Sequence, residues 1–384
     1  MKNTMPITIE QNYILEILHD FLHEEKTDIK DVNCEKLYTI ANQQQIGAIV
    51  YSQTKNKLFE KVFYHQISRA VRMEKHIKEL ERLLDGYEHF FFKGACLKKL
   101  YPIPRIRSMG DVDLVIHETD QEEIKKRLID NGFIYKNSWM EQSHYYKENI
   151  CYEVHDKLVL SRDNNDKHED FSSEVWKYVK ENRLDWSYHF VYVLFHLRKH
   201  LLGHGVGLRQ FMDIAVLCKC KTDLDWVWIA ESLETLGALE FAKQVFAFNE
   251  KAFDIHPPID TEPMDEEFYQ EALGRIFEGG VFGFGLDDDC SRQILKIMEN
   301  QGVEADGAKK KYILVKLFPP YDQISRCSYL GYLKKSKLLL PFAWIHRLIY
   351  LAGSKEARKE LKKVMSVENR DIQEQQQIKS RWRI

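Results

Sequence analysis

Two aspartates separated by one residue begin a short apolar run, Asp111-Val112-Asp113-Leu114-Val115-Ile116. The run predicts a strand, in which alternate side chains face the same way. Asp111 and Asp113 therefore share a face, and two like charges that close repel each other unless a cation lies between them. Mg²⁺ commonly takes one or two protein carboxylates together with substrate phosphates. The spacing thus predicts a divalent-cation site, with a solvent-facing strand start as the alternative interpretation.

A glycine turn precedes this strand. The segment Phe90-Phe91-Phe92-Lys93-Gly94 predicts a short buried strand that ends at a glycine, and residues 95–101 have the spacing of a helix that stops at Pro102. Such a glycine lets the backbone approach a ligand closely, and the start of the helix offers unpaired N–H groups to an anion. The turn is therefore a candidate phosphate site.

A candidate third carboxylate follows further along the chain. Cys151-Tyr152-Glu153-Val154-His155 predicts another strand, with Glu153 and His155 on one face. Asp156 falls on the opposite face, which favours Glu153 as the third acid. His155 is interpreted either as a residue that orients a carboxylate or as a packed core histidine.

A glycine turn, an Asp-x-Asp strand and a later acidic strand residue make up the pattern of the polymerase-β-like nucleotidyltransferase superfamily. The chain resembles one branch more closely, the family labelled uncharacterised nucleotidyltransferase, in its motifs Lys-Gly-x-x-Leu, Tyr-Pro, Arg-x-x-Gly-Asp-x-Asp-Leu and Glu-x-His. The resemblance covers roughly residues 10 to 350. Three later segments are also similar to that family: His196-Leu197-x-x-His200 with Gly207-Leu208-Arg209-x-x-x-Asp213-Ile214, then Leu317-Phe318-Pro319-Pro320, and Leu338-Leu339-Leu340-Pro341 with Trp344 and Arg347.

The phosphate turn departs from the superfamily pattern at one position. Many members have Gly-Ser or Gly-Gly there, whereas this chain has Gly94-Ala95. Because residue 95 offers no hydroxyl, phosphate contacts would fall to backbone amides and nearby basic side chains.

The resemblance implies a metal-dependent nucleotidyltransferase, which transfers a nucleoside monophosphate from an NTP to a hydroxyl acceptor and releases pyrophosphate. The implied cofactor is Mg²⁺ or Mn²⁺, the donor is an NTP, and the acceptor is a small molecule, a protein or RNA. Asp111 and Asp113 would bind both ions of a two-metal site, while Glu153 would bind one ion and could serve as the general base. The residues expected at the nucleotide are Lys93, Gly94, Ala95, Arg105, Arg107, Ser108, His200, Arg209 and Asp213.

Two other functions stay open. The chain could be a nucleotide-binding module that retains the fold without turnover, which Ala95 allows. It could also be a metal hydrolase centred on His196, His200 and His204, which recur every four residues and would stack on one helix face. No Glu stands between these histidines as in metalloproteases, and Gly203 predicts that the helix ends before His204, so the hydrolase is the weaker alternative.

Composition excludes some partners. The net charge of −3 over 384 residues gives no general drive toward nucleic acid, so no DNA partner is expected. The seven cysteines are scattered, which predicts free thiols and a cytoplasmic location. No apolar stretch reaches about eighteen residues, so no membrane partner is expected. The longest apolar cluster, from Leu338 to Tyr350, predicts an amphipathic core helix.

The expected fold class is α+β: a small mixed-sheet nucleotidyltransferase core between N-terminal helices and a larger C-terminal helical domain. Apolar residues recur with helical spacing before and after a central stretch in which strands and a helix alternate. The expected domain boundaries are 1–86, 87–160 and 161–366. Residues 367–384, with three consecutive glutamines, predict a polar, frayed tail.

Overall fold

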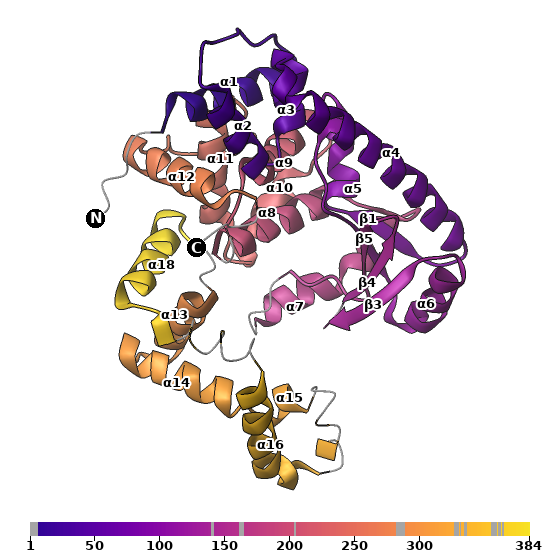
Figure 1. Cartoon of the computed structure of the whole chain (residues 1–384), viewed down its shortest axis with the longest axis vertical. Helices are drawn as coiled ribbons and strands as arrows, with labels where there is room; N and C mark the ends of the chain where they lie inside the picture. Colours follow the sequence, from indigo (N-terminus) through magenta and orange to yellow (C-terminus); the bar gives the residue numbers. More distant parts are fainter. Residues whose placement is uncertain are drawn as a thin grey trace. The chain divides into compact units, whose positions relative to one another are not determined.

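In the computed structural model, a five-stranded sheet carries both predicted acidic strands (Figure 1). The strand order is β1-β2-β5-β4-β3; β2 and β5 run parallel, and the other neighbouring pairs are antiparallel. This mixed sheet, together with the helices around it, confirms the predicted α+β class. The strands are β1 (His89–Phe92), β2 (Asp111–Ile116), β3 (Ile134–Trp139), β4 (Gln142–Lys147) and β5 (Ile150–His155).

The chain forms two units, one of which contains the whole sheet. The first unit comprises residues 1–201, 205–286 and 382–384, and the second comprises residues 202–204 and 287–381. The predicted boundaries at residues 86 and 160 both fall inside the first unit. The structure describes residues 7–139, 142–160, 165–202, 205–281, 289–325, 330, 332–333, 336–354, 359, 362 and 365–384.

Helices precede the sheet and are inserted between its strands. The first begins with a capping box, in which the Thr8 hydroxyl accepts from the backbone N–H of Gln11 while the Gln11 side chain accepts from that of Thr8. The helices of this part are α1 (Ile9–His23), α2 (Cys34–Gln43), α3 (Gly47–Thr54), α4 (Glu60–Leu83), α5 (Gly94–Leu97) and α6 (Gln121–Asp130), with short 3₁₀ turns at Lys57–Phe59, Lys98–Leu100, Pro104–Ile106 and Glu118–Asp120.

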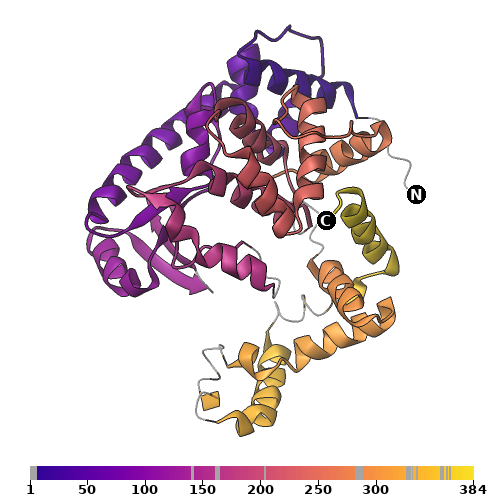
Figure 2. The ribbon, with the colours of Figure 1, turned by 180° about the vertical axis from the view of Figure 1, so that it is seen from behind.

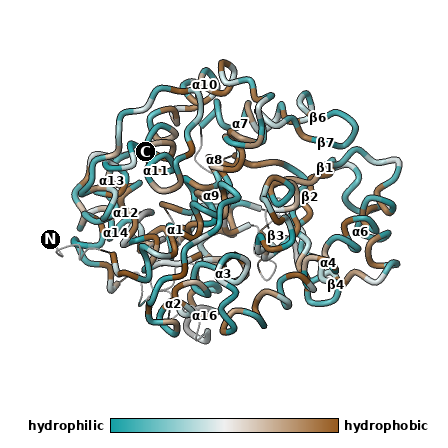
Figure 3. The backbone as a smooth tube through the Cα atoms, turned by 90° about the horizontal axis from the view of Figure 1, so that it is seen from above, coloured by the Kyte–Doolittle hydropathy of each residue, from teal (hydrophilic) through white to brown (hydrophobic). Residues whose placement is uncertain are grey.

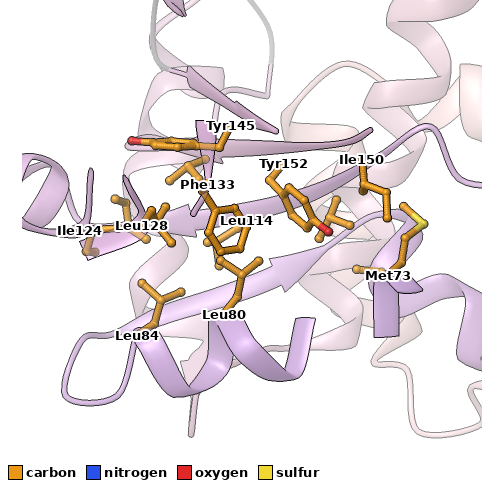
Figure 4. Packing of buried hydrophobic residues seen from close by; sticks show 14 of the residues in the cluster. Met73, Leu80, Leu84, Leu114, Ile124, Leu128, Phe133, Tyr145, Ile150 and Tyr152 are labelled. Carbon is orange, nitrogen blue, oxygen red and sulfur yellow. The ribbon is translucent and has the colours of Figure 1, made fainter. Parts of the chain in front are cut away.

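Alternation along β2 and β5 gives the sheet one apolar face. The even-numbered residues of both strands are buried in a single hydrophobic cluster with residues of α4 and α6. Figure 4 shows Leu80 of α4 packed beside Leu114 and Tyr152 of the sheet. Because successive strand residues point to opposite faces, the odd-numbered residues of β2 and β5 lie on the other face. The predicted acids are among these odd-numbered residues.

A group of helices follows the sheet in the first unit. α8 lies against the face of the acids, since the rings of Phe92 and Tyr192 are 5.3 Å apart. α11 packs against α1, α9 and α10, and these helices can be followed in both ribbon views (Figures 1 and 2). The elements are α7 (Asp166–Ser173), a 3₁₀ turn (Val175–Tyr178), β6 (Val179–Lys180), β7 (Arg183–Leu184), α8 (Trp186–Leu202), α9 (Leu208–Cys220), α10 (Trp226–Thr235), α11 (Leu239–Phe253) and α12 (Glu266–Gly279).

The second unit is helical in its described residues. α13, α14 and Ile372 of α18 share a buried hydrophobic cluster. The prediction of a frayed tail is therefore wrong for α18, because its Ile372 and Ile378 are buried despite the polar sequence around them. The elements are α13 (Asp289–Gln301), α14 (Ala305–Leu317), α15 (Tyr321–Ile324), a 3₁₀ turn (Lys337–Leu339), α16 (Leu340–Gly353) and α18 (Asn369–Arg381).

Hydropathy does not map simply onto burial in this molecule. The tube in Figure 3 shows hydrophobic stretches alternating with hydrophilic ones along most elements.

Among the described residues, no helix combines the length and the apolar character needed to cross a membrane. The segment Leu338–Tyr350 is helical from Leu340 onward, but Phe342, Ile345 and Ile349 are exposed, which corrects the prediction of a core helix.

Candidate active site

The parallel pairing of β2 with β5 brings two of the predicted acids together. Asp113 is opposite Glu153 in the register, and Asp111 is opposite Cys151. Parallel neighbours in register project side chains of the same parity to the same face. Asp111, Asp113 and Glu153 consequently share the face that α4 and α6 leave uncovered.

His155 completes a compact group with two of these acids. One ligand atom each from Asp113, Glu153 and His155 lie within 4.8 Å of one another. The His155 Nε2 atom is 3.3 Å from Asp113 Oδ1 and 3.8 Å from Glu153 Oε2. On the adjoining strand β4, the His144 Nε2 atom is 3.5 Å from Glu153 Oε1. Asp111 lies outside the 4.8 Å group but on the same face of β2.

The acids perturb one another strongly. Burial, reinforced by the charges of Asp113 and Asp111, raises the pKa of Glu153 to about 7. Burial and Asp113 likewise raise the pKa of Asp111. Burial would also raise the pKa of Asp113, which is only 3% exposed, but Lys93 and His155 outweigh it and hold that pKa at about 2. Excess negative charge is thus gathered where solvent is largely excluded, which is the condition that a bound cation relieves.

Lys93 supplies positive charge from the turn after β1. Its Nζ atom is 2.7 Å from Asp113 Oδ1. Burial alone would lower the pKa of Lys93, but Asp113, Tyr192 and Asp111 together outweigh burial and keep it above the usual range. The backbone of Lys93 has a φ of +49°, a region that L-residues rarely adopt and that costs about 1–3 kcal/mol.

A histidine on α8 supports this unusual backbone. The N–H of Lys93 donates to His189 Nε2 at 2.8 Å. Burial lowers the pKa of His189 to about 4, so the ring is neutral and its Nε2 can accept. The backbone N–H of Lys93 is therefore bound by His189 of α8, and its side chain is bound by Asp113 of β2.

Gly94 is required by close packing at the same turn. A Cβ atom added at Gly94 would lie 2.8 Å from Arg107 Nη1 and 3.2 Å from Met109 Cγ. Ala95 follows as a buried residue of α5. The glycine predicted as a phosphate-binding position thus also makes room for the Arg107 guanidinium.

Arg107 and Asp213, both predicted at the nucleotide, bind each other. Arg107 Nε donates to Asp213 Oδ1 at 2.8 Å, and Arg107 Nη2 donates to Asp213 Oδ2 at 2.6 Å. The Tyr101 hydroxyl donates to the same carboxylate at 2.7 Å. Two parallel bonds from an arginine to a carboxylate satisfy both groups. This pairing supports a structural function for Arg107 and Asp213 more than contact with a phosphate.

The remaining basic residues occupy different places. Arg105 is half exposed and pairs with Glu74, its Nη2 atom 3.0 Å from Glu74 Oε2. Arg209 is half-buried, and its Nη1 donates to the carbonyl and the hydroxyl of Ser108, each at 2.9 Å. Ser108 Oγ in turn donates to the carbonyl of Gln45. Arg209 and Ser108 thus fix the segment just before Asp111, whereas Arg105 points to α4.

Histidines of α8 extend the wall of the site. The Nε2 atoms of His196 and His200 are 3.1 Å apart, and burial, with Lys93 nearby, lowers the pKa of His196 well below its usual range. His204 lies outside the described residues. Among the residues that the structure describes, the groups of three or more candidate metal ligands contain neither His196 nor His200.

The structure thus assembles some predicted residues and separates others. Asp111, Asp113, Glu153 and Lys93 lie together, while Arg105 lies apart. Sequence reasoning missed His144 and His189. His144 enters the site because it is opposite Glu153 in the pairing of β4 with β5, whereas nothing local distinguishes His189 on its apolar helix.

A divalent cation fits the donor set on this face. Carboxylate oxygens suit Mg²⁺ or Mn²⁺, and an imidazole nitrogen is tolerated better by Mn²⁺ than by Mg²⁺. Burial first, and then the charges of Asp113 and Asp111, raise the pKa of Glu153, and a bound cation would offset both effects. Asp111, Asp113 and Glu153 are the residues that would hold the ion.

Comparisons with known proteins agree with this geometry. The model of the family described as "Uncharacterised nucleotidyltransferase" matches residues 30–254, a span from α2 to the end of α11 that includes the sheet and the acids. Searches of curated proteins and of solved structures each found no significant match to this sequence. Since the family model covers more than half of the chain and includes the acidic strands, the chain belongs to the uncharacterised nucleotidyltransferase family.

Proposed function

We propose that the protein transfers a nucleoside monophosphate from an NTP to a hydroxyl acceptor in a reaction that depends on Mg²⁺ or Mn²⁺. The oxygen of the acceptor bonds to the α-phosphorus while the bond from that phosphorus to the pyrophosphate oxygen breaks. Pyrophosphate leaves, and the proton of the acceptor hydroxyl passes to a base. When bound, divalent cations neutralise the charge that builds on the attacking and leaving oxygens.

The residues of this chain would divide the remaining work. Glu153 is the proposed base, because its pKa of about 7 suits a group that takes up a proton at neutral pH. Asp111 and Asp113 would hold the cations. Lys93, which pairs with Asp113, is positioned to neutralise phosphate charge, and His155 orients Asp113 by its contact with Oδ1.

One observation carries the proposal. Asp113 and Glu153 are opposite each other on a parallel strand pair, with Asp111 on the same face, and the ammonium of Lys93 pairs with Asp113. Lys93, Arg209 and Lys199 all act on these carboxylates, yet the pKa values of Asp111 and Glu153 both stay raised, so the site favours added cations. Such an excess of carboxylate charge is unusual in a merely structural cluster, where buried charges are paired.

The test is a transfer assay with purified protein. Each of the four NTPs, labelled at the α-phosphate, is supplied with Mg²⁺ or Mn²⁺ and a native lysate as a source of acceptors. We expect one species to gain the α-label while pyrophosphate appears, and we expect chelation of the metal to stop both. A double variant, Asp111→Asn with Asp113→Asn, should abolish transfer, with its folding checked by circular dichroism.

Two results would contradict the proposal in different ways. Tight nucleotide binding with no transfer to any acceptor would indicate the nucleotide-binding module without turnover. Transfer that persists in the double variant would show that the chemistry lies elsewhere.

A further inference from the structure

α16 is apolar on two sides, and one side already has its partners. Ala343 is fully buried in a cluster with Ile324, Leu330 and Leu333. Trp344 packs at the edge of this cluster, and its indole N–H donates to the carbonyl of Pro319 at 2.9 Å. The inner side of the helix is therefore anchored within the second unit.

The other side of the helix carries an exposed apolar stripe. Leu338, in the turn before α16, is 86% exposed, and Phe342, Ile345 and Ile349 are 66%, 58% and 68% exposed. Their spacing of four, three and four residues places them on one helix face. A contiguous exposed apolar stripe of this kind marks an interaction surface more often than a solvated one.

The net charge of the second unit indicates the charge that a partner of this stripe would carry. Residues 287–381 contain nineteen Lys and Arg but twelve Asp and Glu, although the whole chain has 56 basic and 59 acidic residues. Exposed lysines of this unit include Lys337, directly before the stripe, and Lys310 and Lys311 on α14. Two copies of so basic a unit would repel each other, whereas an anionic partner would be attracted.

We propose that α16 docks in the interface of an anionic lipid membrane, with the stripe Leu338, Phe342, Ile345 and Ile349 among the acyl chains. A helix with an apolar face and basic flanks is the kind that lies in the plane of a membrane without crossing it. The stripe is mainly aliphatic, which favours acyl chains over nucleobases, since bases gain most from stacking on aromatic rings. The proposal is independent of the catalytic one and concerns where the protein resides.

The test uses the full chain and vesicles. Sedimentation is measured with vesicles of equal parts phosphatidylcholine and phosphatidylserine, and with vesicles of phosphatidylcholine alone. We expect binding to the anionic vesicles, weaker binding to the neutral ones, and loss of the difference at high salt. Phe342→Ser with Ile345→Ser should lower the partition coefficient by about tenfold or more.

A matched control makes the same chemical change elsewhere. Val227→Ser with Ile134→Ser replaces two apolar residues that are equally exposed but lie in the first unit, and it should leave vesicle binding unchanged. Because all four positions are exposed, both double variants are expected to fold.

Other outcomes overturn the proposal. Absence of vesicle binding would do so, as would equal loss in the control variant. A wild-type dimer, seen by analytical ultracentrifugation and abolished by Phe342→Ser with Ile345→Ser, would show that a second copy covers the stripe. Binding of RNA with no binding of vesicles would assign the basic unit to nucleic acid instead.

Discussion

Two charged clusters lie at the turn of Lys93 and Gly94, and they differ in how their charges balance. The anchor cluster consists of Arg107, Asp213 and Tyr101, in which one guanidinium meets one carboxylate through two hydrogen bonds. The acidic cluster consists of Asp111, Asp113, Glu153, His155 and Lys93, in which three carboxylates meet one lysine.

In this comparison the balance of charges distinguishes the structural cluster from the candidate catalytic one, whereas residue type does not. The anchor residues and Asp113 are buried, Asp111, Glu153 and Lys93 are half-buried, and both clusters contain residues that the sequence motif singles out. The anchor cluster is complete without a ligand. In the acidic cluster, burial together with the charges of Asp113 and Asp111 raises the pKa of Glu153 to about 7.

Asp213→Asn should produce the largest loss of stability. It leaves the buried Arg107 without its carboxylate, and breaking one partner from a buried ion pair costs about 3–5 kcal/mol. The free energy of unfolding, from urea titration, measures the effect. A loss below about 1 kcal/mol would show that solvent or a neighbour replaces Asp213, and the comparison of the clusters would then fail.

Asp111→Asn should produce the opposite pattern. It removes one of three crowded carboxylates, so the stability of the metal-free protein should hold or rise, because burial and Asp113 raise the pKa of Asp111. Nucleotidyl transfer should fall roughly a thousandfold, or about 4 kcal/mol of transition-state stabilisation. Parallel measurements of transfer rate and urea denaturation separate the two effects. Loss of activity together with an equal loss of stability would indicate that Asp111 supports the fold and not the reaction.

Glu153→Gln should change how stability depends on pH. The folded pKa of about 7 lies above the usual value of 4.5, so the stability contribution of Glu153 is complete below about pH 4.5 and is lost as pH rises through 7. In EDTA at pH 8, the variant should be more stable than wild type by roughly 1–3 kcal/mol, and the two should converge at acidic pH. A difference that does not vary with pH would contradict the assigned pKa.

Gly94→Ala should cause the smallest effect, about 1–2 kcal/mol of destabilisation. The new Cβ would lie 2.8 Å from Arg107 Nη1, and Arg107 cannot move freely because Asp213 holds it. Gly274→Ala in α12 is the matched control, since no atom lies within 4 Å of its added Cβ. That control should be neutral or slightly stabilising, as alanine suits a helix better than glycine. Thermal denaturation of both variants checks the pair.

Much of the acidic cluster was predictable because its information is local. Alternation in Asp111–Ile116 and in Ile150–His155 fixes which residues share a face, and the apolar residues between the acids fix which face is buried. The partner of Arg107 was not predictable in this way. Asp213 lies 106 residues further along the chain, and only the packing of α9 near the turn brings the two together.

The helical second unit shows more clearly what the spacing of apolar residues cannot predict. The spacing of apolar residues in 338–350 predicts a helix correctly, but spacing cannot tell which of two apolar sides is covered. The polar sequence of residues 369–381 likewise concealed a helix, because two isoleucines and one buried glutamine suffice to dock it. Periodicity therefore identified elements better than it identified their surroundings.

Titration calorimetry tests the central claim most directly. It measures the binding of Mn²⁺ to the nucleotide-free protein at pH 6 and at pH 8. If the crowded carboxylates of β2 and β5 form the cation site, wild type should bind Mn²⁺ more tightly at pH 8 and release a proton at pH 6, while Asp111→Asn should bind weakly at both. Equal Mn²⁺ affinity in wild type and Asp111→Asn, with no proton release, would contradict it.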